Sequence, residues 1–190
     1  LAAVPRPSLA ALERHPHLAA QLEPGWVRVD LHAHTMWSGD STTTPEEIEH
    51  AVVDCGLDVL CITDHNAVAG AVELGDRLDD CRVIVGEELR TAAGEIIGLF
   101  LAERIPIGVG YLDAARAIRD QGGVVYIPHP FDPMRRNMSE SALFELAEAD
   151  LIDAVEVFNA KTSLASLNRR AAEFASEFGI VGGAGSDGHV

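Results

Sequence analysis

The chain of 190 residues is 47% hydrophobic and has a mean hydropathy of +0.11, a globular composition that excludes a disordered polypeptide. Its 14 Lys and Arg residues against 30 Asp and Glu residues give a formal net charge of −16 at pH 7, which argues against a general nucleic-acid binder because phosphate backbones would be repelled. No apolar run approaches the ~20 residues of a membrane span, and no signal peptide opens the sequence.

The length predicts one domain with a substantial core, preceded by a short extension. We expect a helical extension over residues 1–24, with a short helix at 8–14, and the main domain over residues 25–190. The sequence lacks an initial Met and stops directly after Ser186-Asp-Gly-His189, so we expect both ends to be cut short.

The three cysteines, Cys55, Cys61 and Cys81, are odd in number and form no CxxC pair. This pattern favours reduced thiols in a cytoplasmic protein over a disulfide framework. Cys61 lies in an apolar run, where we expect it to pack in the core.

Strands and helices alternate along the main domain. After a strand at 27–31, the run Thr44-Pro-Glu-Glu47 supplies an N-cap, a first-turn Pro and acidic residues for a helix that ends at Gly56. The run 58–63 is almost continuously apolar, as expected of a parallel strand covered on both faces. Further strands are expected at 82–85, 95–101, 124–127, 154–158 and 180–184, and further helices at 67–78, 112–121, 139–147 and 164–178. This alternation favours an α/β barrel or a doubly wound sheet.

His and carboxylate residues gather where these strands end. They are His32 and His34, Asp64 and His65, Glu87 and Glu88, His129, and Asp187 and His189. In a barrel of parallel strands all those turns lie on the carboxyl-end face, where active sites are found. His32 and His34 are two apart on a strand, so both imidazoles point to the same side and can reach one metal ion. A mixture of imidazole and carboxylate without thiolate suits Zn, Mn or Fe.

The other histidines are expected on the surface. His15 and His17 repeat the HxH spacing but lie in an irregular segment with no strand beneath them. His50 falls within the helix that begins at Pro45. Five of the eight histidines therefore remain at strand ends beside carboxylates, which predicts a metal site.

Five short motifs, in order over about residues 27–189, resemble the polymerase and histidinol phosphatase (PHP) family. They are Asp30-Leu-His-Ala-His-Thr35, Thr63-Asp-His65, Gly86-Glu-Glu88, Pro128-His-Pro130 and Gly185-Ser-Asp-Gly-His189. The resemblance implies a distorted, TIM-like (β/α)7 barrel of parallel strands, with the metal site at the carboxyl-end face. It also implies two or three divalent ions (Mn, Zn or Fe), usually for phosphoester hydrolysis.

The resemblance further implies how the ligands are shared between the ions. His32, His34, Glu88 and Asp187 would surround the first ion, Glu88 would bridge to a second that His129 also binds, and Asp40, His65 and His189 would hold a third. In the Gly86-Glu-Glu88 motif the family's ligand is the last residue, so Glu87 is expected outside the ligand set.

The sequence departs from the family at Glu95, where many members carry His. A carboxylate there can still bind a metal and would tilt the preference toward Mn or Fe, because carboxylate is a harder ligand than imidazole. A surface position at the start of a strand is the alternative for Glu95. Asp30 and Asp64, beside ligands, are expected to orient imidazole N–H groups. Trp37 and Ser38 are expected at the rim of the pocket, although Trp37 fits cavity packing equally well.

The expected mechanism is attack by a metal-activated hydroxide, because clustered divalent ions lower the pKa of bound water toward neutrality. Arg135 and Arg136, on the loop after His129, are expected to bind a phosphate through their guanidinium groups, with solvated loop residues as the alternative. The sequence assigns no general acid, and His65 and His189 are the only candidates.

These features predict a metal-dependent phosphoesterase acting on a small phosphate ester, such as a phosphomonoester, a nucleotide or a short oligonucleotide end. Three alternatives remain: hydrolysis of a non-phosphate substrate such as an amide, a nuclease acting on nucleic-acid ends, and a non-catalytic module whose metals only stabilise the fold. The nearly complete ligand set argues against the last. No extended nucleic acid and no membrane is expected as a partner, and the sequence leaves the oligomeric state open.

Overall fold

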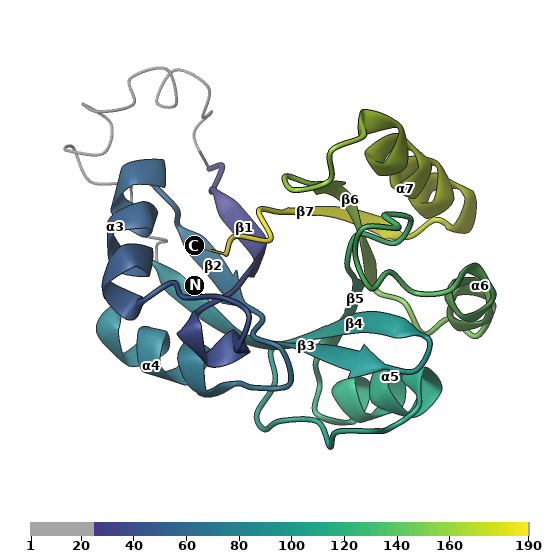
Figure 1. Cartoon of the computed structure of the whole chain (residues 1–190), viewed down its shortest axis with the longest axis horizontal. Helices are drawn as coiled ribbons and strands as arrows, with labels where there is room; N and C mark the ends of the chain where they lie inside the picture. Colours follow the sequence, from purple (N-terminus) through teal and green to yellow (C-terminus); the bar gives the residue numbers. More distant parts are fainter. Residues whose placement is uncertain (1–24, 190) are drawn as a thin grey trace.

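The computed structural model describes residues 25–189, so the predicted extension 1–24 with its helix, and His15 and His17, lie outside the described residues. Over residues 25–189 one sheet of seven strands, ordered β1 to β7, curves into a nearly closed barrel with the helices on its outer side (Figure 1). The predicted α/β barrel of TIM-like shape is confirmed.

The described elements follow the predicted order. The strands are β1 (Val29–Ala33), β2 (Val59–Ile62), β3 (Arg82–Thr91), β4 (Gly94–Leu99), β5 (Val124–Ile127), β6 (Ala154–Asn159) and β7 (Val181–Gly185). The helices are the 3-10 turn η1 (Met36–Ser38) and α3 (Pro45–Cys55), α4 (Ala69–Arg77), α5 (Tyr111–Asp120), α6 (Glu140–Glu148) and α7 (Ala165–Phe178). The N-terminus of α3 is capped as predicted, since the Thr44 side chain and Glu47 form a reciprocal capping box.

The segment after β7 brings the two edges of the barrel together. Ala33 of β1 forms a parallel bridge with Gly188, and the backbone N–H of Asp187 donates to the carbonyl of His32 at 2.7 Å. The end of the described chain therefore lies beside the end of β1, as Figure 1 shows.

The expectation that all strands run parallel is wrong for β4. The pairings β3–β4 and β4–β5 are antiparallel, while β1–β2, β2–β3, β5–β6 and β6–β7 are parallel. Only two residues separate Thr91 from Gly94, which is too short for a crossover and forces a hairpin. Gly94 has φ +131°, and a Cβ there would meet the Met138 backbone at 2.3 Å, so the turn requires glycine. The predicted end of the third strand at Val85 is wrong for the same reason, because the hairpin extends β3 to Thr91.

Alternating side chains build a core on both faces of the sheet. Cys61, Ile84 and Tyr126 pack together inside the barrel, whereas Leu60 and Ile62 face outward against α3 and α4. Cys61 is thus a core residue, as expected, and burial raises the pKa of its thiol to about 12. All three cysteines are free. No helix of residues 25–189 has both the length and the apolar character needed to cross a membrane.

Candidate metal centre

The end of β1 places two imidazoles on one side. His32 and His34 are fully buried, and their Nε2 atoms are 3.0 Å apart. The Glu88 Oε2 atom lies 3.5 Å from His32 Nε2 and 3.2 Å from His34 Nε2. Asp187 Oδ1 approaches the same two nitrogens at 3.8 and 3.7 Å. The four residues predicted to surround one ion therefore converge on one point.

The β3–β4 hairpin supplies two carboxylates. Glu88 lies within β3 and not in a strand-to-helix turn, which corrects the prediction. Because β4 runs antiparallel, its start lies at the face where the parallel strands end, and this brings Glu95 into the site. His129 Nε2, after β5, is 3.3 Å from Glu88 Oε1 and 3.8 Å from Glu95 Oε2. Glu95 is 4% exposed, so the alternative of a surface position is wrong.

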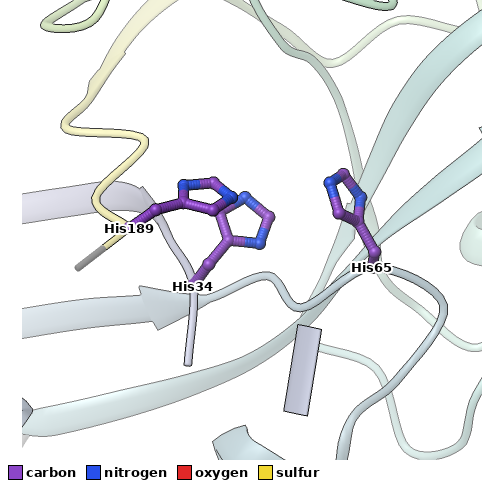
Figure 2. A group of neighbouring side chains, drawn as sticks. All are labelled: His34, His65 and His189. Carbon is purple, nitrogen blue, oxygen red and sulfur yellow. The ribbon is translucent and has the colours of Figure 1, made fainter. Parts of the chain in front are cut away.

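Asp40, His65 and His189 form a third group of candidate ligands, next to Glu88. His65 Nε2 is 3.1 Å from Asp40 Oδ2, and His189 Nε2 is 3.6 Å from Asp40 Oδ1. Figure 2 shows the rings of His34 and His189 beside each other, with His65 standing apart from them on the segment after β2. One ring nitrogen of each of these three histidines lies within 4.8 Å of a ring nitrogen of the other two.

The nine residues predicted as ligands therefore form one continuous group, which we call the ligand cluster: His32, His34, Asp40, His65, Glu88, Glu95, His129, Asp187 and His189. The remaining candidates lie elsewhere. Glu87 points away from the cluster and accepts a hydrogen bond from the backbone of Ile105 at 2.8 Å, and His50 is exposed on α3.

The chemistry of the ligand cluster fits divalent cations. His32 Nδ1 is 3.1 Å from Glu156 Oε1 and His34 Nδ1 is 3.0 Å from Ser38 Oγ, which leaves both Nε2 atoms free to face each other and the carboxylates. Among the described residues, buried atoms without a hydrogen-bond partner include His65 Nδ1 and Glu88 Oε1. Converging lone pairs and buried polar atoms that make no hydrogen bond are what a metal ion would satisfy.

Charges inside the cluster shift several pKa values. Burial opposes protonation of His32, but the carboxylates of Glu156 and Glu88 outweigh it and raise the pKa of this imidazole. Burial would raise the pKa of Glu88, yet the positive charge of His32 and hydrogen bonds from neighbouring imidazoles hold it well below its usual value. Burial, together with the charge of Glu88, raises the pKa of Glu95 to about 7. Burial lowers the pKa of His65 to about 4. The lowered pKa of Glu88 and the raised pKa of His32 both favour an ionised carboxylate beside a protonated imidazole.

Glu156, which the sequence analysis did not identify, supports the cluster from β6. It is 1% exposed, its Oε1 atom holds His32 Nδ1, and its Oε2 atom accepts from the backbone N–H of His129 at 2.7 Å. Asn159 Nδ2 donates to Glu156 Oε2 at 2.9 Å and to Asp187 Oδ2 at 3.3 Å. An acidic residue in the middle of the apolar run 154–158 was the available signal.

The carboxylates of Asp30 and Asp64 accept hydrogen bonds from backbone N–H groups. The expectation that they orient imidazole N–H groups is therefore wrong. Asp30 Oδ1 accepts from the N–H groups of His32 and Ser186, and Asp64 accepts from the N–H and the hydroxyl of Thr35. These contacts fix the ends of the strands at which the ligands lie.

Ser38 lies beneath the site and not at its rim. It is 7% exposed, and its Oγ atom contacts His34 Nδ1 and accepts from the His65 backbone. Trp37 is half exposed and donates its indole N–H to Glu73 of α4, so it is neither a rim nor a cavity residue.

Two positions in the cluster adopt left-handed backbone. His129 has φ 28° and Asp187 has φ 52°, values that non-glycine residues rarely adopt. The Glu156 carboxylate holds the His129 N–H, and the carbonyl of His32 holds that of Asp187. Surrounding hydrogen bonds thus stabilise strained backbone at the site, a common feature of functional centres.

A cavity of about 160 Å³ opens onto the ligand cluster, and basic residues line its mouth. Arg135 Nε lies 3.5 Å from Asp187 Oδ2, and Arg136 is exposed beside it. Arg90, which the sequence analysis did not identify, pairs with Asp40 at 2.6 Å and with Glu95 at 3.3 Å. Lys161, also unforeseen, places Nζ 2.8 Å from His189 Nδ1. We call Arg90, Arg135, Arg136 and Lys161 the cationic rim.

Comparisons with known proteins agree with this geometry. The PHP domain model matches residues 30–165, and the model of the PHP-associated region matches residues 165–190. An uncharacterized protein of Methanocaldococcus jannaschii is 37% identical over 146 residues, which cover 70% of this chain and 82% of that protein.

Solved structures share the barrel. A two-domain protein from Bacteroides vulgatus, described as containing a predicted PHP-like metal-dependent phosphoesterase, superposes with a TM-score of 0.73 at 20% identity, over 86% of this chain and 52% of that one. An amidohydrolase from Chromobacterium violaceum, solved with bound sulfate and no metal, superposes with a TM-score of 0.70 at 17% identity, over 85% of this chain and 87% of that one. At these identities the two structures show the common fold alone, and this chain spans about half of the Bacteroides protein.

Proposed function

Because the chain belongs to the PHP domain family, we propose that it is a divalent-metal-dependent phosphoesterase that hydrolyses a small phosphate ester. The observation that carries the proposal is that metal-binding and basic side chains lie together at one cavity. The ligand cluster forms the floor, and the cationic rim surrounds the mouth. A phosphate ester needs both, since its anionic oxygens are held by cations while the phosphorus is attacked.

We propose that two or three divalent ions of Mn, Zn or Fe occupy the cluster. His32, His34 and Asp187 would hold one, with Glu88 between it and a second held by His129 and Glu95, and Asp40, His65 and His189 would hold a third. When bound, such ions polarise phosphoryl oxygens and lower the pKa of water toward neutrality. The extra carboxylate of Glu95 favours the harder ions Mn and Fe.

The cationic rim is proposed to bind the phosphate. Arg135 and Arg136 line the cavity and offer guanidinium groups, which match phosphate oxygens two at a time, and Lys161 adds a point charge beside His189. Arg90 and Arg135 are paired with carboxylates of the cluster, so bound cations would add the positive charge that draws a phosphate to this cavity on a chain of net charge −16. Small phosphate esters therefore fit better than long polymers, whose distant phosphates would meet the acidic surface.

Protonation of the leaving group is proposed for His189 when the third ion is absent, because a ring nitrogen that binds an ion carries no proton. His189 lines the cavity and lies beside Lys161, which brings it close to the proposed phosphate position. His65 lines the same cavity between Asp40 and Glu88, but burial lowers its pKa to about 4, so it is the weaker candidate for an acid near neutral pH.

Amide hydrolysis is the second candidate, favoured by the fold shared with the Chromobacterium amidohydrolase. Turnover separates the candidates. With added Mn²⁺, we expect the protein to hydrolyse 4-nitrophenyl phosphate and not 4-nitroacetanilide. Turnover of the anilide alone would support the amide reaction, and turnover of neither substrate would favour a non-catalytic metal-stabilised module.

Metal content provides a separate test. The nine residues of the ligand cluster are too many for one ion, so we expect protein purified without chelator to contain at least two equivalents of divalent metal by elemental analysis. Less than one equivalent in total would contradict the proposed multi-metal site.

A further inference from the structure

A second hollow adjoins the metal cavity and is apolar in character. It has a volume of about 310 Å³ and lies between the loop after β5 and the loop that leads into α7. Its apolar lining comes from Pro133, Met134, Leu164 and Leu167. We call this hollow the leaving-group groove.

The leaving-group groove shares lining residues with the metal cavity. Met134 and Arg135 line both, and Lys161, whose Nζ contacts His189, lines the groove from the opposite loop. Positive charge therefore lies where the two hollows meet, with metal ligands on one side and apolar side chains on the other. A ligand that spans the boundary needs an anionic end and an apolar body.

Hydrogen bonds tie the two walls of the groove together. Asp132 Oδ1 accepts from the Met134 N–H at 3.0 Å, and Asp132 Oδ2 accepts from the Thr162 hydroxyl at 2.8 Å. Asn159 Oδ1 accepts from the N–H groups of Lys161 and Thr162, while its amide donates to Asp187 in the ligand cluster. The groove is thus preformed, and both oxygens of its one acidic lining residue are already engaged.

We propose that the leaving-group groove binds the aromatic alcohol part of the substrate, so that the phosphate ester carries a ring system of one or two rings. This inference rests on the proposed phosphoesterase function. The volume lies at the lower end of the about 300–1,000 Å³ typical of small-molecule pockets, which suits such a group. The flexible Met134 side chain packs well on ring faces, and Arg135 and Lys161 at the edge add cation–π attraction.

The position of the groove suits the chemistry. In hydrolysis the oxygen of water forms a new bond to phosphorus, the bond to the ester oxygen breaks, and that oxygen takes up a proton. With phosphate between the ligand cluster and Arg135, the departing alcohol points out of the metal cavity. The leaving-group groove is the apolar surface that it meets there.

Calorimetric titration of the Mn²⁺-loaded full chain with three phosphonates tests the proposal without turnover. Phenylphosphonate is expected to bind at least about tenfold more tightly than methylphosphonate, because burying a ring removes more apolar surface from water than burying a methyl group. Butylphosphonate is expected to fall between them. The variant Leu164→Ser, at a residue that lines the groove and not the metal cavity, should reduce the phenyl-to-methyl ratio at least about twofold while leaving methylphosphonate affinity unchanged. Leu164 is 60% exposed, so the change costs little stability.

Ile107→Ser, at another exposed apolar residue (63% exposed), is the matched control and should leave all three affinities unchanged. Equal binding of phenyl- and methylphosphonate to the wild type, or a ratio that Leu164→Ser does not reduce, would overturn the groove proposal alone. Butylphosphonate binding as tightly as phenylphosphonate would overturn the aromatic assignment. If none of the three bound, the phosphoesterase function itself would fail and the groove proposal with it.

Discussion

The ligand cluster and the cationic rim lie at the same cavity but are built differently. Apart from Asp40, the cluster residues lie on strands or shortly after them. Six of the nine are buried, and Asp30, Asp64 and Glu156 hold the surrounding backbone. Three of the four rim residues lie in the loops after β5 and β6, and Arg136 is exposed. The difference indicates that the barrel fixes the metal chemistry, while the loops are free to set which substrate is bound.

Removal of a cluster residue should give the largest effect. Asp187→Asn or His34→Ala takes away a residue that converges with Glu88 on one point, and we expect turnover to fall below detection. The apolar core does not include either side chain, so circular dichroism and the thermal midpoint should show a folded protein. A folded variant with near-wild-type activity would contradict the assignment of metal binding to the cluster and substrate binding to the rim.

Loss of a supporting residue should have the next largest effect. Glu156→Gln keeps the size of the side chain but removes the charge that faces His32. We expect metal affinity, measured by competition with a chelator, to fall about 10- to 100-fold, the usual cost of changing a group that orients a ligand. The matched control is Glu145→Gln, on the outer surface of α6, which should leave affinity unchanged. Equal metal affinity in both variants would show that Glu156 only fills space.

The rim should affect binding of substrate but not of metal. Arg135→Ala or Arg136→Ala should reduce catalytic efficiency toward a phosphate ester by roughly 10- to 150-fold, which corresponds to about 1.5–3 kcal/mol for a hydrogen bond to a charged group. Metal content should stay unchanged because guanidinium groups do not bind cations.

The control for the rim is Arg116→Ala on α5, which removes the same charge at an exposed residue that pairs, among residues 25–189, with Asp113 in its own helix. It measures the part of the effect that comes from overall charge. Equal losses at Arg116 and Arg135 would leave no reason to place phosphate beside the loop after β5, and would favour the amide reaction.

The sequence predicted the ligand cluster far better than its surroundings. His32 and His34 follow from the period-two geometry of a strand, and the ends of parallel strands share one face, so short local patterns were sufficient. Glu156 was missed because its role depends on His32, 124 residues away and across the barrel. Lys161 lies in a loop whose path no local pattern determines.

The hairpin is the other part that local reasoning missed. From the sequence we predicted that the third strand ends at Val85, but in the structure it continues to Thr91. The longer strand places Arg90 beside Asp40 and Glu95. Strand direction could not be read from the apolar pattern, because the same pattern serves parallel and antiparallel neighbours. Two residues between Thr91 and Gly94 were the available signal for a hairpin.

The smallest effect is expected at Glu95, the cluster residue with a rim partner. Glu95→His removes a carboxylate that contacts Arg90 and adds an imidazole beside His129, so the site becomes less negative and its ligands softer. We expect the ratio of Zn²⁺ to Mn²⁺ affinity to rise several-fold, with activity retained, because imidazole suits Zn²⁺ better than Mn²⁺. Glu95→Gln is the matched control, since it removes the charge without supplying an imidazole and should weaken both metals together. Competition titrations with the two ions in one chelator buffer measure the ratio. An unchanged ratio in Glu95→His would show that Glu95 balances the charge of Arg90 and does not select the metal.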